Sequence, residues 1–460
     1  MCSPIDGSRE DAAESLQKQI DFDIGEANRL RYAQNLHTTV SRLPTELLAE
    51  AFFCIVESGL RDRDSCFAAG TFNFLQVCKH WNEVALGDPR LWRWWVVGAV
   101  RAWPLFSSLS KGSPLYLVWW SQLPPFARGI LMDPKIPERV RRLDFSGTIE
   151  QLESFISAFN LSPLSKVSSI RLRIHLRGDF EPRDHLARFL SSSFPELSHL
   201  ALENFLPNSS PPIFTAPNLI SLELTLHSES KNHYTFPQFL QILRSYPSIR
   251  ELVLVRGGIP RSSSSGTSPT SFTFPQLVDL RLCGTEEDIL GFVDAIDMSS
   301  LHNVALCFKW FWIVTAPAPA LARAVEKALV ACRECRGLKD PRKVNSLTVS
   351  YNPENRHLDF YTQSCRSTPT SNLNPSLLLR FDGVGAASDE MIREVLPLFP
   401  LDDIREFCVG GLRLRAGACR GMLQKMKNVS WLELRNIALR PALEALSSEE
   451  GMFKVIAKPR

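Results

Sequence analysis

A chain of 460 residues is too long for one ordinary hydrophobic core, so we expect two or more domains or one elongated repeat array. Its composition, 44% hydrophobic and 22% charged, is typical of soluble folded proteins. The net charge of +3 argues against a nucleic-acid partner, and no stretch reaches the roughly 18 apolar residues that a membrane helix needs.

Residues 1–38 predict a charged helical leader. The first 14 residues are polar and acidic, which excludes a secretory signal. Residues 10–38 carry apolar side chains at a loose helical spacing, and Asp23 and Gly25 interrupt this spacing. Two interpretations stay open for the leader: a short coiled coil, or a segment that is only partly ordered.

Residues 43–92 predict two amphipathic helices followed by an apolar hook. Pro44 suits the first turn of a helix, and the apolar residues after it recur at spacings of three and four. A second helix follows over residues 74–85, and Pro89 ends it because proline disfavours helix in the residue before it. The apolar positions of the two helices are Leu47, Leu48, Ala51, Phe52, Ile55, Phe74, Val77, Cys78, Trp81, Val84 and Ala85.

The motifs LPTELL, VCKHW and VALGDPRLW follow one another in this stretch, and together they resemble an F-box. F-box proteins of this style are numerous in mushroom-forming fungi. Two departures are visible: Ala51 stands where the family often has a larger aliphatic residue, and the loop between the helices (Glu57 to Gly70) is longer than in the compact form. The residues that match the family motif are Leu43, Pro44, Leu47, Leu48, Phe52, Val77, Cys78, Trp81, Leu91 and Trp92.

After residue 114 the sequence changes character. PLYLVWW predicts a strand, and then a unit recurs in which apolar residues stand at positions one, four and six. Successive units start mostly 22 to 30 residues apart, which is the period of leucine-rich repeats. The units begin at Val140, Val167, Leu197, Leu219, Ile249, Leu277, Leu301, Val344, Ile404 and Val429, with a degenerate copy at Leu377 to Phe381.

Helical patterns lie between these units, and several units follow a turn that contains proline: FPEL, APNL, YPSI and FPQL. Alternating strands and helices predict an α/β solenoid with a parallel β-sheet on its concave face and helices on its convex face. The segment resembles the irregular leucine-rich repeats that follow many F-boxes. The predicted domains are thus the leader (1–38), the F-box (39–100) and the repeats (101–460).

We find no pattern for catalysis or for a cofactor. No phosphate-binding glycine loop or GxSxG motif occurs, and the histidines lack metal-ligand spacing. Cys332 and Cys335 form a CxxC without a second pair nearby, so we expect no metal. Cys78 fits a small buried thiol better than a nucleophile. The eleven cysteines, in a chain without a secretory signal, are expected to be reduced, which predicts a cytoplasmic or nuclear protein.

The strand positions between the core residues are expected to face away from the core, because side chains alternate along a strand. These positions predict a candidate target-binding face. Its charged residues are Glu203, Glu223, Glu251, Asp279 and Arg281. Two interpretations stay open: a mildly acidic patch that favours a basic protein segment, or ordinary solvated charges.

The resemblance implies a non-catalytic substrate receptor of an SCF-type cullin–RING ubiquitin ligase. The F-box would bind the adaptor subunit, and through it a cullin, while the repeats would bind a protein target. The alternative is a protein-interaction scaffold without a ligase role. Neither hypothesis involves a nucleic acid, a membrane or a small-molecule ligand.

Overall fold

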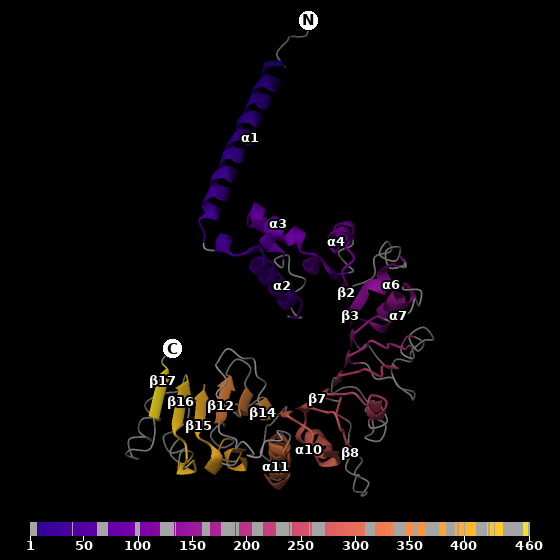
Figure 1. Cartoon of the computed structure of the whole chain (residues 1–460), viewed down its shortest axis with the longest axis vertical. Helices are drawn as coiled ribbons and strands as arrows, with labels where there is room; N and C mark the ends of the chain where they lie inside the picture. The colour runs from indigo at the N-terminus through magenta and orange to yellow at the C-terminus, as the bar shows by residue number, and fades with distance from the viewer. Residues whose placement is uncertain are drawn as a thin grey trace. The chain divides into compact units, whose positions relative to one another are not determined.

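The chain forms two compact units, Met1–Arg141 and Arg142–Arg460 (Figure 1). The structure is a computed structural model. It describes residues 7–38, 40–61, 72–96, 102–119, 133, 135–158, 166–175, 189, 193–204, 215–226, 239, 242–256, 258–259, 272–308, 318–334, 346–352, 357–363, 377–382, 392, 395–399, 401–410, 421, 424–426, 428–435 and 454–458.

The first unit opens with one long helix, α1 (Gly7–Leu36). The predicted leader helix is therefore confirmed, but it runs through Asp23 and Gly25 without a break. Gln19 donates a side-chain hydrogen bond to Asp23 one turn later, and an ion pair joins Glu14 to Lys18 at 2.7 Å. Such pairs support a helix whose side chains face water, because residues four apart are neighbours on its surface.

The two predicted amphipathic helices follow η1 (Val40–Arg42), and the second differs from the prediction. The first helix is α2 (Thr45–Arg61). Where one helix was predicted over residues 74–85, the structure has a short η2 (Asn73–Gln76) and then α3 (Lys79–Gly87). Cys78 lies between them in extended backbone as the N-cap of α3, so its predicted place on a helix face is wrong.

The hook and the following strands complete the first unit. After η3 (Pro89–Trp92) come β1 (Trp94–Val96), α4 (Trp103–Leu109), β2 (Leu115–Trp119) and α6 (Lys135–Arg139). The predicted strand in PLYLVWW is confirmed as β2, which pairs with β1 in parallel. Parallel strands need a crossover between them, and α4 lies in that connection.

One hydrophobic core joins the helices to these strands. The guanidinium of Arg93 lies between two aromatic rings, 4.7 Å from the centroid of Phe53 on α2 and 4.2 Å from that of Tyr116 on β2. Helix α2 is therefore packed into the same body as β1 and β2. The buried members of this core are Leu48, Ala49, Phe52, Val56, Phe74, Val84, Ala85, Leu91, Trp92, Trp94 and Val118.

A long sheet organises the second unit, in which β3 (Val140–Gly147) begins at the boundary between the units. The sheet order from β3 onward is β3-β4-β5-β6-β7-β9-β11-β14-β13-β12-β15-β16-β17. The other strands are β4 (Ser169–Ile174), β5 (His199–Glu203), β6 (Ser221–Leu226), β7 (Glu251–Arg256), β9 (Asp279–Gly284), β11 (Asn303–Phe308), β12 (Ser346–Asn352), β13 (His357–Gln363), β14 (Leu377–Asp382), β15 (Glu406–Gly410), β16 (Trp431–Arg435) and β17 (Lys454–Lys458). A separate small sheet pairs β8 (Phe272–Thr273) with β10 (Ile296–Asp297).

The recurring apolar unit coincides with the strands. In β5, for example, Leu200 and Leu202 are buried, and Leu197 is buried just before the strand. The proline turns also recur: the amide of Leu197 donates to the carbonyl oxygen of Phe194 at 3.1 Å, and Leu219 donates to Ala216 at 3.2 Å. This hydrogen bond spans four residues with proline second, which is a favoured position for proline in a β-turn. Each such turn therefore aims the chain into the next strand.

The sheet is not parallel throughout, which corrects the expectation of an all-parallel sheet. β13 runs antiparallel to both β12 and β14, and β14 lies beside β11. The order of β12, β13 and β14 is thus reversed relative to the sequence. Only residues 353–356 separate β12 from β13. So short a connection allows a hairpin but not the crossover that a parallel pair needs.

Three helices of the second unit fall where the sequence predicts helices: α7 (Ile149–Ala158), α10 (Glu286–Ala295) and α11 (Ala318–Glu334). α10 contacts β9 and β11, α11 contacts β11 and β14, and the two helices touch each other (Figure 1). The other predicted helical stretches fall largely outside the described residues.

Lys327 of α11 forms hydrogen bonds to α10. Its Nζ donates to the backbone carbonyl oxygens of Val293 at 2.7 Å and Asp294 at 3.4 Å, in the last turn of α10. Carbonyls in a last helical turn have no partner within the helix, so the lysine satisfies them. Burial lowers the pKa of Lys327, and Asp294 and Asp297 oppose this shift.

We expect Lys327→Met to lower the free energy of unfolding by about 1 kcal/mol, because it removes these hydrogen bonds and keeps the aliphatic stem. Urea denaturation of the full chain measures the change. Arg323→Met is the matched control, since Arg323 lies one turn earlier on the same helix and is exposed. Equal losses in the two variants would contradict the role of Lys327.

Candidate functional site

Helix α2 carries the candidate site, and its residues fall on three faces. Glu46 in the first turn complements the positive end of the helix, and the amide of Leu48 donates to the carbonyl oxygen of Pro44 at 3.1 Å. Successive residues turn by about 100° around a helix. One face therefore holds the buried residues Leu48, Ala49, Phe52 and Val56, and each flank of this face is exposed.

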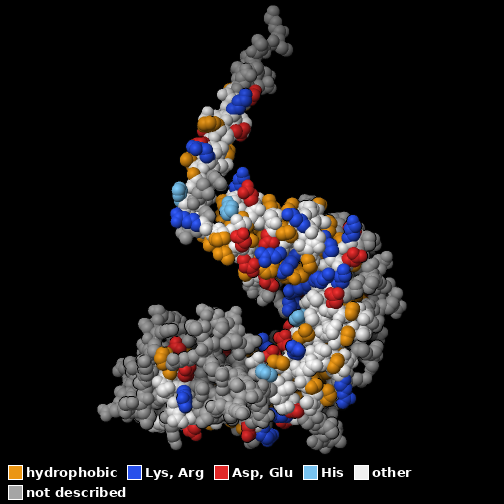
Figure 2. All heavy atoms as spheres, in the orientation of Figure 1, with side chains coloured by type: hydrophobic (Ala, Val, Ile, Leu, Met, Phe, Trp, Pro, Cys, Tyr) orange, Lys and Arg blue, Asp and Glu red, His pale blue; other side chains and the backbone are white. Residues whose placement is uncertain are grey.

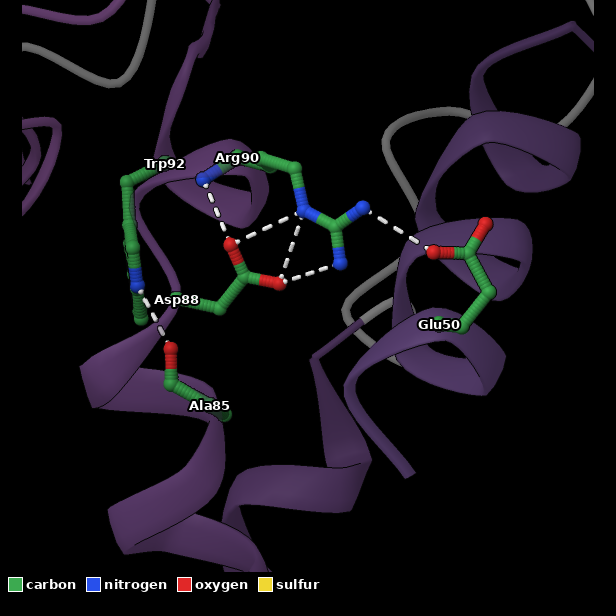
Figure 3. A network of polar contacts seen from close by, with 5 residues as sticks. All are labelled: Glu50, Ala85, Asp88, Arg90 and Trp92. Carbon is green, nitrogen blue, oxygen red and sulfur yellow. Dashed lines mark hydrogen bonds and ion pairs between the residues drawn. The ribbon is translucent and has the colours of Figure 1, made fainter. Parts of the chain in front are cut away.

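Four of the ten motif residues are buried in the core of the first unit: Leu48, Phe52, Leu91 and Trp92. The ring of Phe52 stacks on Phe74 with centroids 4.4 Å apart. The indole Nε1 of Trp92 donates to the carbonyl oxygen of Ala85 at 2.8 Å (Figure 3), so the hook is held against the end of α3. These four side chains build the module and do not offer a surface.

A second group of motif residues is exposed. Leu43 is 39% exposed, Leu47 58% and Val77 50%. Ile55, which the family motif does not include, is 50% exposed, and Pro44 and Ala51 are also exposed. Leu43 precedes α2, and Leu47, Ala51 and Ile55 follow it at intervals of four residues. We name these four residues the apolar strip.

The remaining two motif residues, Cys78 and Trp81, are half-buried. The Trp81 ring packs against Phe52 with centroids 5.1 Å apart, so part of its surface belongs to the core. In Figure 2, hydrophobic side chains reach the surface among charged ones over α2 and α3. The ten motif residues thus divide into a core group, an exposed group and this pair.

The flank of α2 opposite the apolar strip forms a charged groove of about 750 Å³ against α3 and η3. Arg90 crosses this region: it donates to both carboxylate oxygens of Asp88 and, at 2.9 Å, to Glu50 on α2 (Figure 3). The hydrogen bond with Asp88 is the main cause of the raised pKa of Arg90. The groove is lined by Thr45, Glu46, Ala49, Glu50, His80, Glu83, Val84, Gly87, Asp88, Pro89 and Arg90.

We expect the Glu50–Arg90 pair to contribute little to stability. Both side chains are about half exposed, at 54% and 48%, and exposed ion pairs are worth at most about 1 kcal/mol. A double-mutant cycle with Glu50→Gln and Arg90→Met, followed by urea denaturation, measures their coupling energy. A coupling above about 2 kcal/mol would contradict this expectation.

The candidate target-binding face of the second unit is less acidic than its sequence indicates. Glu203 pairs with Arg173 at 2.7 Å, and Glu223 lies 4.0 Å from Arg171. Asp279 accepts a hydrogen bond from Asn303 on the next strand. Two of the four carboxylates thus face arginines, which sequence reasoning missed because these arginines lie one and two strands away.

The five predicted residues of this face do not share one row of the sheet. Glu251 is in register with Asp279, and Glu223 is in register with Val253, which is itself paired with Arg281. Glu203 belongs to a third row, with Thr225. Glu251 and Arg281 are exposed and the other three are half-buried. The face therefore carries mixed charges in separate rows.

No protein-family model matches the chain, and no curated protein matches it. In the part of the chain that the structure describes, no helix is long and apolar enough to cross a bilayer. Among the same residues, no three His, Cys, Asp or Glu side chains are grouped to hold a metal ion. A function for this chain has to be inferred from its own residues.

Proposed function

We propose that this protein is a non-catalytic substrate receptor of an SCF-type ubiquitin ligase. Residues 43–92 bind the adaptor subunit, and the second unit selects the protein target that is then marked for proteasomal degradation. The receptor acts through proximity, because it holds a target near a charged ubiquitin-conjugating enzyme. It supplies no reacting group of its own.

The apolar strip is the observation that carries the proposal. Leu48, Phe52 and Val56 already satisfy the core-facing side of α2, so the exposed Leu47 and Ile55 are not needed for the fold. Exposed apolar side chains that gather on one side of an element mark protein interaction sites. A helix that docks in this way presents anchors one turn apart, which is the spacing of Leu47, Ala51 and Ile55 on α2.

The order of the motifs supports the adaptor as the partner. LPTELL supplies the start of the strip, VCKHW supplies the exposed Val77, and PRLW supplies the buried hook. Ala51 leaves a smaller contact in the middle of the strip than the family often has. We expect this to reduce affinity, since each methylene kept from burial is worth about 0.8 kcal/mol.

The second unit supports a repeat solenoid as the target-binding part. From β3 to β7 each strand pairs in parallel with the next strand of the sequence, and proline turns recur before the strands. Stacked units of this kind form a continuous core and an extended sheet face. We propose that this face binds the target. The reversed strands β12 to β14 interrupt the regular repeat.

Co-purification of the full chain with a recombinant adaptor subunit tests the proposal. We expect wild-type protein to retain the adaptor and, through it, a cullin. Failure to retain the adaptor would refute the ligase role. Retention of the adaptor without a cullin would favour the second candidate, an interaction scaffold, for which the departure at Ala51 is the supporting feature.

A further inference from the structure

Two cysteines lie directly opposite each other in the sheet of the second unit. Cys283 on β9 is in register with Cys307 on β11, and the two strands are parallel neighbours. Neighbouring strands lie about 4.8 Å apart, so the Cα atoms of paired residues fall within the range of about 4.4 to 6.8 Å that a disulfide spans. The register therefore places these two cysteines at a Cα separation that a disulfide can span.

The side chains of the pair point to the same side of the sheet. Both cysteines follow a core leucine, Leu282 and Leu306, and paired residues on neighbouring strands share a face. Cys283 is 9% exposed and Cys307 1%, so a small oxidant reaches Cys283 first.

Two arginines stand near this pair, and one of them, Arg380, is itself ion-paired with Asp359 at 2.8 Å. Arg281 stands two residues before Cys283 on β9, and Arg380 on β14 is in register with Cys307. The hydrogen bond with Cys283 and burial raise the pKa of Cys307, while Arg281 and Arg380 oppose this rise. The net shift of the Cys307 pKa is upward, which favours its thiol form over the more reactive thiolate.

We propose that Cys283 and Cys307 form a reversible oxidation site, at which a peroxide converts the two thiols into a disulfide between β9 and β11. The sulfur of Cys283 attacks one peroxide oxygen, which breaks the O–O bond and yields a sulfenic acid and water. The sulfur of Cys307 then attacks this sulfenic sulfur, the new S–S bond forms, and a second water leaves. Two thiols lose two electrons in total, and one hydrogen peroxide gains them.

This site does not depend on adaptor binding. A disulfide between two protein thiols is reversed by exchange with an added dithiol. We therefore expect dithiothreitol to restore both thiols. The disulfide would join two neighbouring strands of the proposed target-binding face. It should therefore raise the urea concentration at the midpoint of unfolding of the second unit.

Peptide mapping of the full chain tests the proposal. The protein is treated with hydrogen peroxide, its remaining thiols are blocked with iodoacetamide in guanidinium chloride, and the digest is analysed by mass spectrometry. We expect a linked peptide pair containing Cys283 and Cys307, lighter by two hydrogens than the reduced peptides, and its loss after dithiothreitol. This experiment uses the wild-type protein, so it shows whether the disulfide forms even if a cysteine variant fails to fold.

Variants locate the bond. Cys307→Ser should abolish the linked pair and leave Cys283 open to iodoacetamide or oxidised further. Cys408→Ser is the matched control, because Cys408 on β15 is half-buried and its paired neighbours are Thr348 and Glu433. The proposal is overturned if both cysteines remain open to iodoacetamide at a peroxide dose that oxidises the exposed Cys54, or if either one links to a different cysteine.

Discussion

Leu47→Asp combined with Ile55→Asp should weaken adaptor binding by a factor of roughly 100 or more. Burying a Leu or Ile side chain is worth about 1.5 to 3 kcal/mol, and every 1.4 kcal/mol is a factor of ten in the dissociation constant. The loss of two apolar contacts and the burial of two carboxylates at an apolar interface both make the binding free energy less favourable. Isothermal titration calorimetry with the purified adaptor measures the effect.

The fold should survive this double substitution, because Leu47 and Ile55 are 58% and 50% exposed and lie away from the core. Leu105→Asp is the matched control: Leu105 on α4 is 50% exposed in the same unit and outside the apolar strip. The control should bind the adaptor as wild type does. An unchanged dissociation constant for the double variant would remove the strip from the interface.

Trp92→Ala should destabilise the first unit by about 3 to 5 kcal/mol, the usual cost of truncating a buried tryptophan. Trp92 is 2% exposed, and its ring packs on Phe72 and Phe106 with centroids 5.6 and 5.2 Å apart. The loss also leaves the carbonyl oxygen of Ala85 without this donor. Such a cost is a large fraction of the total stability of a domain.

Hydrogen exchange followed by mass spectrometry measures this loss where it occurs, over residues 40–119. Trp92→Phe is the control, because it keeps an aromatic ring while it loses the indole donor and part of the ring volume, so we expect a smaller loss than in Trp92→Ala. We expect Trp92→Ala to impair adaptor binding through the fold and not through a lost contact. Wild-type exchange protection in Trp92→Ala would contradict the assignment of this residue to the core.

Periodicity along the chain predicted much of the secondary structure. The unit with apolar residues at positions one, four and six located β3 to β7 because a strand buried on one face must alternate, and that alternation is visible in the residues themselves. It did not predict β13, whose sequence HLDFYTQ lacks the unit. Nor did it predict the place of β14 beside β11, which depends on long-range pairing.

The candidate site shows the same division. Spacing along α2 placed Leu47, Leu48 and Phe52 on one apolar side of the helix, but the pattern is the same whether a side chain faces the core or water. Packing against Phe74 and Trp81 decides that Phe52 belongs to the core. The charges of the candidate target-binding face show a related limit, because Arg173 and Glu203 are 30 positions apart and meet only across paired strands.

The sequence by itself determined that two short amphipathic helices precede a long series of strands, since local hydrophobic spacing encodes helix and strand. Only the tertiary structure decided which apolar side chains in the segment 43–92 are buried and which form the apolar strip. It also decided that Cys283 is in register with Cys307 and that β13 is antiparallel to its neighbours. Burial and register arise from contacts between distant parts of the chain, which no local pattern contains.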